Sequence, residues 1–302
     1  MIRNVKHQPY KSITESNKKY IPTGFCKLDE ALNDLVTGTV TIINGRPADG
    51  KSTVVHQIIV NAIDKGFKTL IVDGEHDQEM LINKLYKIVI GGNRDLYRLV
   101  QCNKKYLKEP KPNILEMLKL WHDDRLCILS KHTHSLQNFE ALFSLIELSV
   151  KAELIDFIVL DNLMSLIDST SAELNASQSK FMKRCTTLAK AQNVAIILVA
   201  HPNKTAQKGK EIDYFQISGN SDLANLADNI FQVIKNPTDD KDGIEADGRI
   251  VVQKNRYYGD TPSIDLVYDT ETNSLLEIVN GEGRRVKLDW RREGTQNGLD
   301  GI

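Results

Sequence analysis

The feature that most constrains the fold is a glycine-rich turn between a strand-like and a helix-like pattern. Residues 45–53 place two glycines, separated by four residues, directly before a lysine and a hydroxyl side chain. In such a turn the backbone N–H groups face phosphate oxygens, the lysine reaches the same oxygens, and the hydroxyl can bind Mg²⁺. The sequence therefore predicts that ATP and Mg²⁺ bind to a phosphate loop formed by Gly45, Arg46, Pro47, Ala48, Asp49, Gly50, Lys51, Ser52 and Thr53.

Alternating strand and helix patterns predict an α/β fold. Near-continuous apolar runs, typical of strands buried on both faces of a sheet, occur at 39–44, 68–73, 125–129, 155–161, 195–200 and 229–234. Helical periodicity lies between them, and a first helix is expected from residue 28 to residue 35, followed by helices at 52–65, 79–90, 136–153 and 174–192. After residue 247 the pattern changes to short strands, at 249–254, 264–268 and 274–278. We expect a parallel-core sheet, flanked by helices, that ends in antiparallel strands.

Composition indicates an ordinary soluble protein with one domain. Residues 21–280 are expected to form this domain, between a basic arm at 1–20 and a flexible basic tail at 281–302. No apolar run approaches the ~20 residues that span a bilayer, and the N-terminus lacks the apolar stretch of a secretory signal. We therefore expect a cytoplasmic protein without a membrane partner. The formal net charge is −1, so a site for nucleic acid would have to be local.

Two carboxylates follow strands that are predicted to lie in the centre of the sheet. Asp161 ends the run at 155–161, where it would hold Mg²⁺ opposite Ser52. Glu75 comes two residues after the strand at 68–73, where a carboxylate can accept a proton from an attacking water molecule. Three neighbouring carboxylates compete with Glu75 for that role: Asp73, Asp77 and Glu79. The alternative is that this acidic stretch, Glu75 included, only marks the start of a helix.

A histidine and a cationic loop follow the strand at 195–200. His201 is expected near the γ-phosphate, where a polar side chain can respond to the presence of that phosphate; a histidine capping a strand at the surface is the alternative. The loop behind it has lysines and no bulky apolar side chain, which suits contact with a phosphodiester backbone. Its candidate DNA-binding residues are Asn203, Lys204, Lys208 and Lys210, and a solvated charged loop is the alternative.

Two positive charges end the strand predicted at 249–254. An arginine that stabilises charge on a transferred phosphate can come from a neighbouring subunit. Lys254 and Arg256 are candidates for this role, and surface salt bridging is the alternative. Tyr268, on the next predicted strand, is a candidate to stack on the base of the nucleotide, although a tyrosine of the core would fit the same pattern.

Taken in chain order, these motifs resemble the RecA-like motor domain of replicative ring helicases. The resemblance is to the helicase half of phage primase-helicases and the Twinkle type, with DnaB-type helicases more distant. It covers about residues 21–280 and includes residues 45–53, Leu160-Asp161-Asn162-Leu163, Ala200-His201-Pro202 and Lys254-Asn255-Arg256 with Gly259-Asp260. The resemblance implies Glu75 as the catalytic glutamate, His201 as a switch, and Arg256 acting on the ATP of a neighbouring subunit.

The resemblance implies an ATP-driven helicase that forms a ring, expected to be a hexamer, and translocates 5′–3′ on single-stranded or forked DNA. A second DNA contact is expected between Ser165 and Ser177. Only residues 1–20 precede the motor pattern, and the zinc-binding cysteines of a primase are absent, so a primase or another replisome protein would be a separate partner. Three alternatives remain: a RecA-like recombinase or loader that forms a filament on single strands, a non-translocating switch ATPase, and a small-molecule kinase.

Overall fold

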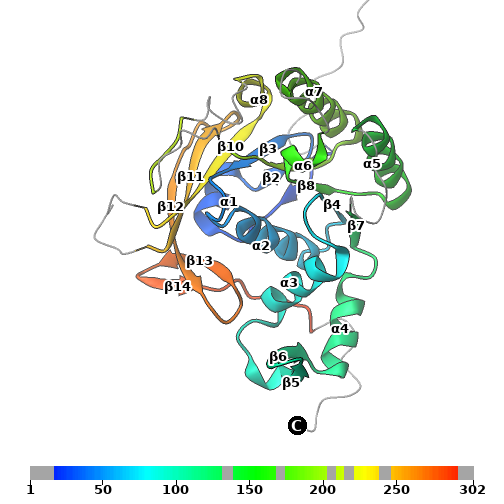
Figure 1. Ribbon diagram of the computed structural model, residues 1–302. Helices are drawn as coiled ribbons and strands as arrows, with labels where there is room; N and C mark the ends of the chain where they lie inside the picture. The colour runs from blue at the N-terminus through cyan, green and yellow to red at the C-terminus, as the bar shows by residue number, and fades with distance from the viewer. Residues whose placement is uncertain are drawn as a thin grey trace, which may run out of the picture.

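The centre of the protein is a ten-stranded sheet in the order β14-β13-β12-β11-β10-β3-β9-β8-β4-β7 (Figure 1). The structure, a computed structural model, describes residues 17–130, 139–167, 174–202, 209–213, 221–237 and 246–291. The parallel strands are β3 (Val40–Asn44), β4 (Thr69–Asp73), β7 (Leu126–Ser130), β8 (Phe157–Asp161), β9 (Ala195–Val199) and β10 (Asn229–Lys235). The antiparallel strands are β11 (Gly248–Asn255), β12 (Ser263–Asp269), β13 (Ser274–Val279) and β14 (Glu282–Arg284).

Helices cover both faces of this sheet and divide the core into two layers. Successive side chains of a strand point to opposite faces. On β3, for example, Ile43 packs in one layer and Ile42 in the other. The first layer contains α1 (Cys26–Leu32), α2 (Lys51–Asp64), α3 (Gln78–Ile90) and α4 (Pro112–His122). The second contains α5 (Phe139–Glu153), α6 (Leu163–Leu166), α7 (Leu174–Gln192) and α8 (Ser221–Leu226). Burial on both faces explains the continuous apolar runs in the sequence.

The predicted fold class is confirmed: a parallel-core sheet flanked by helices ends in antiparallel strands. The central strands begin and end within about two residues of their predicted positions. The first helix is shorter than expected, because α1 ends at Leu32 and the next two residues, Asn33 and Asp34, take positive φ angles of 51° and 65°. Leu35 therefore lies in the short strand β2 (Leu35–Val36), which pairs with β1 (Tyr20–Ile21).

One hairpin was not predicted. The strands β5 (Tyr97–Cys102) and β6 (Lys105–Pro110) pair antiparallel between α3 and α4, after a 3₁₀ helix at Arg94–Leu96. Figure 1 shows this hairpin beside α4, apart from the main sheet. Most of its residues are exposed, including the apolar Leu99 and Tyr106. A hairpin without a buried face has no alternation of apolar and polar residues, and this alternation is the signal from which strands are predicted.

The segment after residue 280 also differs from the expected flexible tail. Residues 282–284 form β14, and a Cβ atom on Gly283 would lie 2.6 Å from Val267 Cγ1, so this glycine allows close packing. Further along, Trp290 is only 5% exposed, and the backbone N–H of Asp289 donates to Asp64 Oδ1 at 2.8 Å. The part of the tail that the structure describes, residues 281–291, therefore packs on the domain. The remaining tail residues, 292–302, and arm residues 1–16 lie outside the described residues.

The carboxylate of Glu277 joins the antiparallel end of the sheet to α1. It is 3% exposed and accepts hydrogen bonds from the backbone N–H groups of Cys26 (2.6 Å) and Lys27 (3.1 Å), the first two residues of α1. The N-cap residue of α1 is Phe25, which has no side-chain oxygen, so Glu277 supplies the acceptors that a capping side chain normally provides.

We predict that Glu277→Ala lowers the free energy of unfolding by about 2–4 kcal/mol, because it removes two hydrogen bonds to a charged acceptor and leaves their donors unpaired. Denaturant unfolding measures this change. Glu282→Ala is the matched control, since Glu282 is exposed on the neighbouring β14, and it should change the stability by less than about 0.5 kcal/mol. Equal stability of the two variants would contradict the role of Glu277.

Among the described residues, no helix is both long enough and apolar enough to cross a bilayer.

Candidate functional site

The loop at 45–53 connects the end of β3 to the start of α2, as predicted. Gly50 is the N-cap of α2 and has a φ of 95°, in the left-handed region that favours glycine. Gly45 has a φ of 154°, and a Cβ atom there would lie 2.5 Å from the carbonyl oxygen of Val233. Both glycines are therefore required by the backbone. The loop places the N-terminus of a 14-residue helix, with its free N–H groups, at the carboxyl end of the sheet.

Lys51 lies inside this loop. Its side chain is 5% exposed, and Nζ donates to the carbonyl oxygens of Gly45 (2.7 Å) and Arg46 (2.9 Å). Burial lowers the pKa of Lys51 to about 8, and the nearby carboxylates, Asp49 first among them, oppose this shift. A hydrogen bond within the loop stabilises its turn, because Asp49 Oδ2 accepts from the backbone N–H of Arg46 at 2.9 Å. A buried cation beside backbone donors is suited to bind an anion such as a phosphate group.

Ser52 and Asp161 meet at the same place. Asp161 ends β8 and is 5% exposed. Burial raises its pKa to about 6, the negative charge of Asp73 adds to this rise, and a hydrogen bond from the Ser52 hydroxyl opposes it. A hydroxyl and a carboxylate in contact are hard oxygen donors, so the pair fits Mg²⁺. The described residues contain no cluster of three or more His, Cys, Asp or Glu side chains for a metal. Mg²⁺ needs no such cluster when phosphates and water complete its shell.

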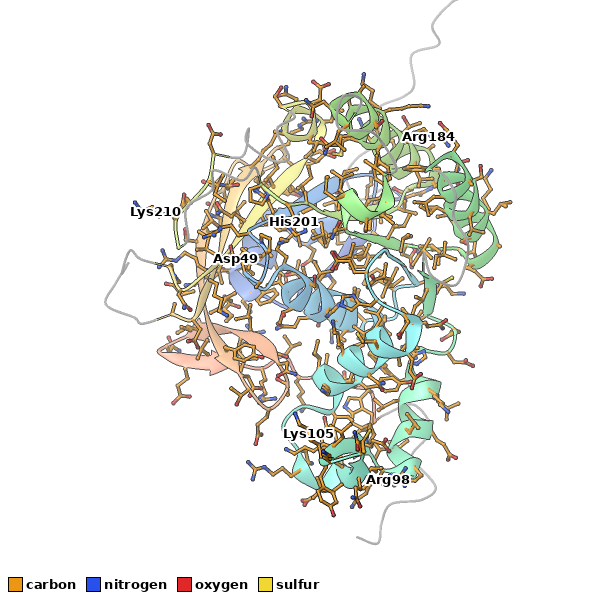
Figure 2. All side chains as sticks on the ribbon, viewed as in Figure 1. Asp49, Arg98, Lys105, Arg184, His201 and Lys210 are labelled. Carbon is orange, nitrogen blue, oxygen red and sulfur yellow. The ribbon has the colours of Figure 1, made fainter. Side chains whose placement is uncertain are left out.

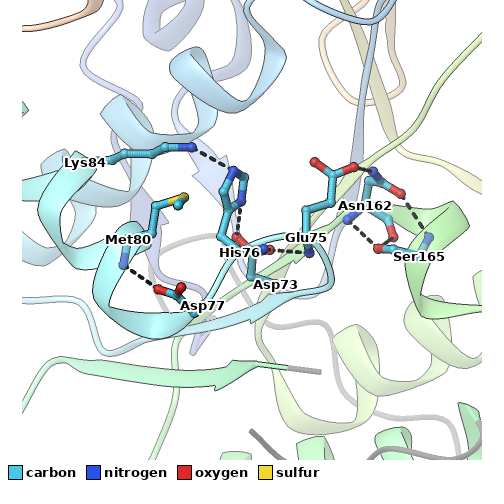
Figure 3. A network of polar contacts seen from close by, with 8 residues as sticks. All are labelled: Asp73, Glu75, His76, Asp77, Met80, Lys84, Asn162 and Ser165. Atoms are coloured by element: carbon cyan, nitrogen blue, oxygen red, sulfur yellow. Dashed lines mark hydrogen bonds and ion pairs between the residues drawn. The ribbon is translucent and has the colours of Figure 1, made fainter. Parts of the chain in front are cut away.

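The acidic segment after β4 divides into structural and available carboxylates (Figure 3). Asp73 Oδ1 accepts from the backbone N–H groups of Glu75 (2.7 Å) and His76 (2.8 Å), and Asp73 Oδ2 lies 3.0 Å from His76 Nδ1. Asp77 caps α3 by accepting from the N–H of Met80 at 2.7 Å. Glu75 is exposed, and it is the member of this segment that lines the cavity beside the phosphate loop. The structure thus places Glu75 where the sequence analysis expected it.

A cavity of about 530 Å³ opens between the phosphate loop and the ends of the neighbouring strands, which is large enough for a nucleotide. His201 lines it from the end of β9 (Figure 2). Burial and the positive charge of Lys51 lower the pKa of His201, so the neutral ring is favoured near pH 7. The cavity is lined by Pro47, Ala48, Gly50, Lys51, Ser52, Thr53, Glu75, Asp161, Asn162, Val199 and His201.

Asn162 is the polar lining residue to which the sequence analysis gave no role. In the sequence it stands in the motif around Asp161, directly after that residue. Its Nδ2 donates to Glu75 Oε1 (Figure 3). The same Nδ2 lies 3.4 Å from His201 Nε2. The available signal was its position directly after a strand-ending aspartate, but its contact with Glu75 spans 87 residues of sequence.

Lys254 and Arg256 lie where the parallel strands begin, whereas the phosphate loop lies where these strands end. Asn255 pairs with Asn229, which pairs with Thr41 near the start of β3, whereas the phosphate loop follows the end of β3. The three residue steps from Thr41 to Asn44 cover ~10 Å along the strand. Neither cation lines the cavity of its own chain.

Both cations have local partners at that edge. Arg256 donates to Asp228 Oδ1 (3.2 Å) and to the Asn225 carbonyl oxygen (2.6 Å), and its side chain is 43% exposed. Lys254 Nζ donates to the carbonyl oxygens of Ala224 and Ala227, both at 2.8 Å. Burial and the neighbouring Arg256 lower the pKa of Lys254. The two side chains are thus held at the surface at the end of β11, with the guanidinium of Arg256 partly open to solvent.

The candidate DNA contacts are described only in part, and Tyr268 lies outside the cavity. Lys210 is exposed and lies at the margin of the molecule in Figure 2, and its carbonyl oxygen accepts from Gln232 Nε2 on β10 at 3.2 Å. The other candidates of that loop, Asn203, Lys204 and Lys208, lie outside the described residues, as do residues 168–173 of the second expected DNA contact. Tyr268 is exposed on β12, and its hydroxyl donates to Asn273 Oδ1 at 3.0 Å.

The chain is similar to known proteins in its sequence and in its fold. Residues 20–277 match the family model of the DnaB-like helicase C-terminal domain. A solved structure described as an ATPase domain is similar, with a TM-score of 0.68 and 15% identity over 86% of this chain and 91% of that chain. A DnaB-like replicative helicase, solved in a study of its interactions with primase, has a TM-score of 0.68 and 15% identity over 84% of this chain and 62% of that one.

A third similar structure is the KaiC-like protein PH0186 from Pyrococcus horikoshii OT3, with a TM-score of 0.59 and 15% identity over 86% of this chain and 99% of that chain. No sequence among the curated proteins matches the chain. The structural likeness confirms the predicted RecA-like fold.

Proposed function

Because the chain belongs to the family of the DnaB-like helicase C-terminal domain, we propose that it is an ATP-driven DNA helicase that assembles into a ring, hexameric as the resemblance implies, and translocates on single-stranded DNA. ATP binds between subunits: one subunit supplies the phosphate loop, Asp161 and Glu75, and the next supplies Arg256 with Lys254. The similar DnaB-like helicase studied with primase makes a primase a candidate partner.

The observation that carries this proposal is the separation of Arg256 from the cavity of its own chain. Arg256 lies at the opposite edge of the sheet from Lys51, so it cannot approach the phosphates that its own loop would bind. Its partly exposed guanidinium is positioned at the surface, where it can enter the cavity of an adjacent copy. An arginine supplied in this way stabilises the charge of the transferred phosphate.

The residues of the cavity have distinct roles in hydrolysis. Lys51 and the N–H groups of the loop bind the phosphates. Ser52 and Asp161 would hold Mg²⁺, which supplies positive charge against the developing charge on the phosphate oxygens. Glu75 orients the attacking water and accepts its proton. His201, half-buried and with its neutral form favoured by Lys51, responds to the γ-phosphate and passes its state to the lysine loop that begins after Pro202.

The DNA contact is proposed for the basic loop that ends at Lys210. The described residues at the end of this loop and directly after it, 209–213, are held against β10 because Gln232 Oε1 accepts from the N–H of Ile212 at 2.9 Å. Gln232 pairs with Asn44, directly before the phosphate loop. A change at the nucleotide therefore has a short physical route to the end of the basic loop. The lysines supply affinity without reading the bases.

Three measurements on the full chain test the proposal: ATP turnover with and without single-stranded DNA, unwinding of a forked duplex, and negative-stain images with an ATP analogue and DNA. We expect DNA-stimulated turnover, unwinding and closed rings. Helical filaments without unwinding would indicate a recombinase or loader instead. ATP turnover that is indifferent to DNA, and unchanged when Lys204, Lys208 and Lys210 become alanine, would indicate a switch ATPase.

The pKa shifts of the cavity predict a bell-shaped pH profile of kcat/KM for ATP, which reports the free protein. Activity should rise as the pH increases through about 6, because Asp161 loses its proton, and fall as it increases through about 8, because Lys51 loses its charge. Asp49→Asn tests the assignment. Asp49 raises the pKa of Lys51, so its neutralisation should move the alkaline limb to lower pH. An unmoved alkaline limb would contradict the assignment to Lys51.

A further inference from the structure

The side chain of Asn162 connects the loop that carries Glu75 to α6, because the nitrogen and the oxygen of its amide group contact one element each. The residue is 4% exposed, and its Nδ2 donates to Glu75 Oε1 (Figure 3). Its Oδ1 accepts from the backbone N–H of Ser165 at 3.0 Å, and Ser165 Oγ lies 3.3 Å from the backbone nitrogen of Asn162, which donates to it. This reciprocal pair is the capping box of α6. The N-cap residue of α6 therefore also holds the carboxylate of Glu75 beside the phosphate loop.

A second contact joins the same two elements. Gly74 precedes Glu75, and its N–H donates to the carbonyl oxygen of Asp161 at 2.7 Å. A Cβ atom on Gly74 would overlap Ser165 Oγ and lie 2.7 Å from Ser165 Cβ. The Glu75 loop and the first turn of α6 are therefore packed without space between them. Because neither can move alone, a displacement of α6 displaces Glu75.

From these contacts we propose that Asn162 is a positioning residue that sets the orientation of Glu75 and couples it to α6. This inference rests on the proposed ATPase function and adds a part to it. Glu75 is exposed, and its side chain has several rotamers of similar energy unless a neighbour selects one. The amide donor selects the rotamer in which Oε1 faces Asn162. The same hydrogen bond also fixes the direction of the second carboxylate oxygen of Glu75, Oε2.

Asn162 links α6 on one side to Glu75 and His201 on the other. α6 follows Asn162 and contains Ser165, the first residue of the segment in which a second DNA contact is expected, Ser165 to Ser177. At its other end Asn162 Nδ2 also lies 3.4 Å from His201 Nε2. One amide thus contacts the proposed base and the proposed switch, and its carbonyl oxygen caps the helix at which the proposed second DNA contact begins. DNA that shifts α6 changes the orientation of Glu75, which makes hydrolysis depend on DNA.

The test compares Asn162→Ser with Ser165→Ala in the full chain. Serine can still cap α6, but it is too short to reach Glu75, whereas Ser165→Ala weakens the cap and leaves the amide donor in place. We expect Asn162→Ser to lower kcat about 10- to 100-fold, since a misplaced general base loses much of its effect. Its KM for ATP and its affinity for a non-hydrolysable ATP analogue should stay within about twofold, because binding does not use Glu75. Ser165→Ala should lower the thermal midpoint but reduce kcat much less.

A compensating pair provides the second test. Gly74→Ala should reduce kcat because the new methyl group displaces α6, and Gly74→Ala combined with Ser165→Gly should recover much of it, because the overlapping atoms are gone. Equal losses of kcat in Asn162→Ser and Ser165→Ala would show that Asn162 only caps α6, and would overturn the inference. So would normal kcat in Asn162→Ser. Absence of ATP turnover in the unaltered protein would instead overturn the proposed function itself, so the two failures are distinguishable.

Discussion

Replacing Arg256 by alanine is expected to lower the rate of ATP hydrolysis by about 10³- to 10⁵-fold, the effect typical of an arginine that stabilises a transferred phosphate from another subunit. The expected loss is large although Arg256 lies at the opposite edge of the sheet from the cavity of its own chain. The Arg256→Ala protein should still bind ATP, since Lys51 and the N–H groups of the phosphate loop are unchanged. Steady-state turnover with single-stranded DNA, and equilibrium binding of a fluorescent ATP analogue, measure the two quantities separately.

Two further variants show whether a loss arises from catalysis or from folding. Arg256→Ala leaves the carboxylate of Asp228 without its partner, so the thermal midpoint must be measured as well. Arg256→Lys keeps a positive charge beside Asp228 but lacks the planar guanidinium, and it should fold normally and remain strongly impaired. Arg94→Ala is the surface control: Arg94 is exposed, pairs with Glu271, and should have little influence on turnover. Full activity of Arg256→Ala would contradict its assigned role.

Glu75→Gln is expected to lower kcat by about 10²- to 10⁴-fold, because the amide cannot accept the proton of the attacking water. The glutamine oxygen can still accept the hydrogen bond from Asn162, so the side chain should keep its place. Affinity for ATP should change little. Rapid-quench measurement of a single turnover detects the chemical step directly.

Asp77→Asn is the matched control for Glu75→Gln. Asp77 lies two residues further along the same acidic segment, but it caps α3, and asparagine caps a helix about as well as aspartate. Its kcat should therefore stay near that of the unaltered protein. If Asp77→Asn lost as much activity as Glu75→Gln, the assignment of the base within this segment would be wrong.

The parts of the fold that follow from burial could be predicted from the sequence. The run at 195–200 is apolar at every position because β9 is buried on both faces between β3 and β8. The backbone requires glycine at 45 and 50 because both residues have positive φ angles. Both glycines belong to the phosphate-loop motif, so the sequence predicts this turn. The hairpin β5–β6 could not be predicted, since Leu99 and Tyr106 are exposed and carry no periodic signal. Residues 281–291 were misassigned because their glycines and charges resemble a mobile segment.

Some residues of the candidate site could also be predicted from the sequence, and others could not. Lys51, Ser52, Asp161 and His201 follow strands or begin helices at positions that a parallel sheet brings together, so order and spacing were sufficient. The contact of Asn162 with Glu75 depends on side-chain geometry across two strands that are distant in sequence. The placement of Arg256 away from Lys51 depends on the antiparallel direction of β11. Local pattern does not predict the contact of Asn162, and the role of Arg256 in a neighbouring site was expected only from the family resemblance.

The central claim is that each hydrolytic site contains residues of two subunits, and a mixing experiment tests it most directly. Lys51→Ala and Arg256→Ala proteins, each inactive alone, are combined under conditions in which mixed rings are shown to form. One type of interface in a mixed ring pairs an intact Lys51 with an intact Arg256. We therefore expect the mixture to recover part of the ATP turnover. Mixed rings without any recovery, or full turnover by a protomer that does not assemble, would contradict a site shared between subunits.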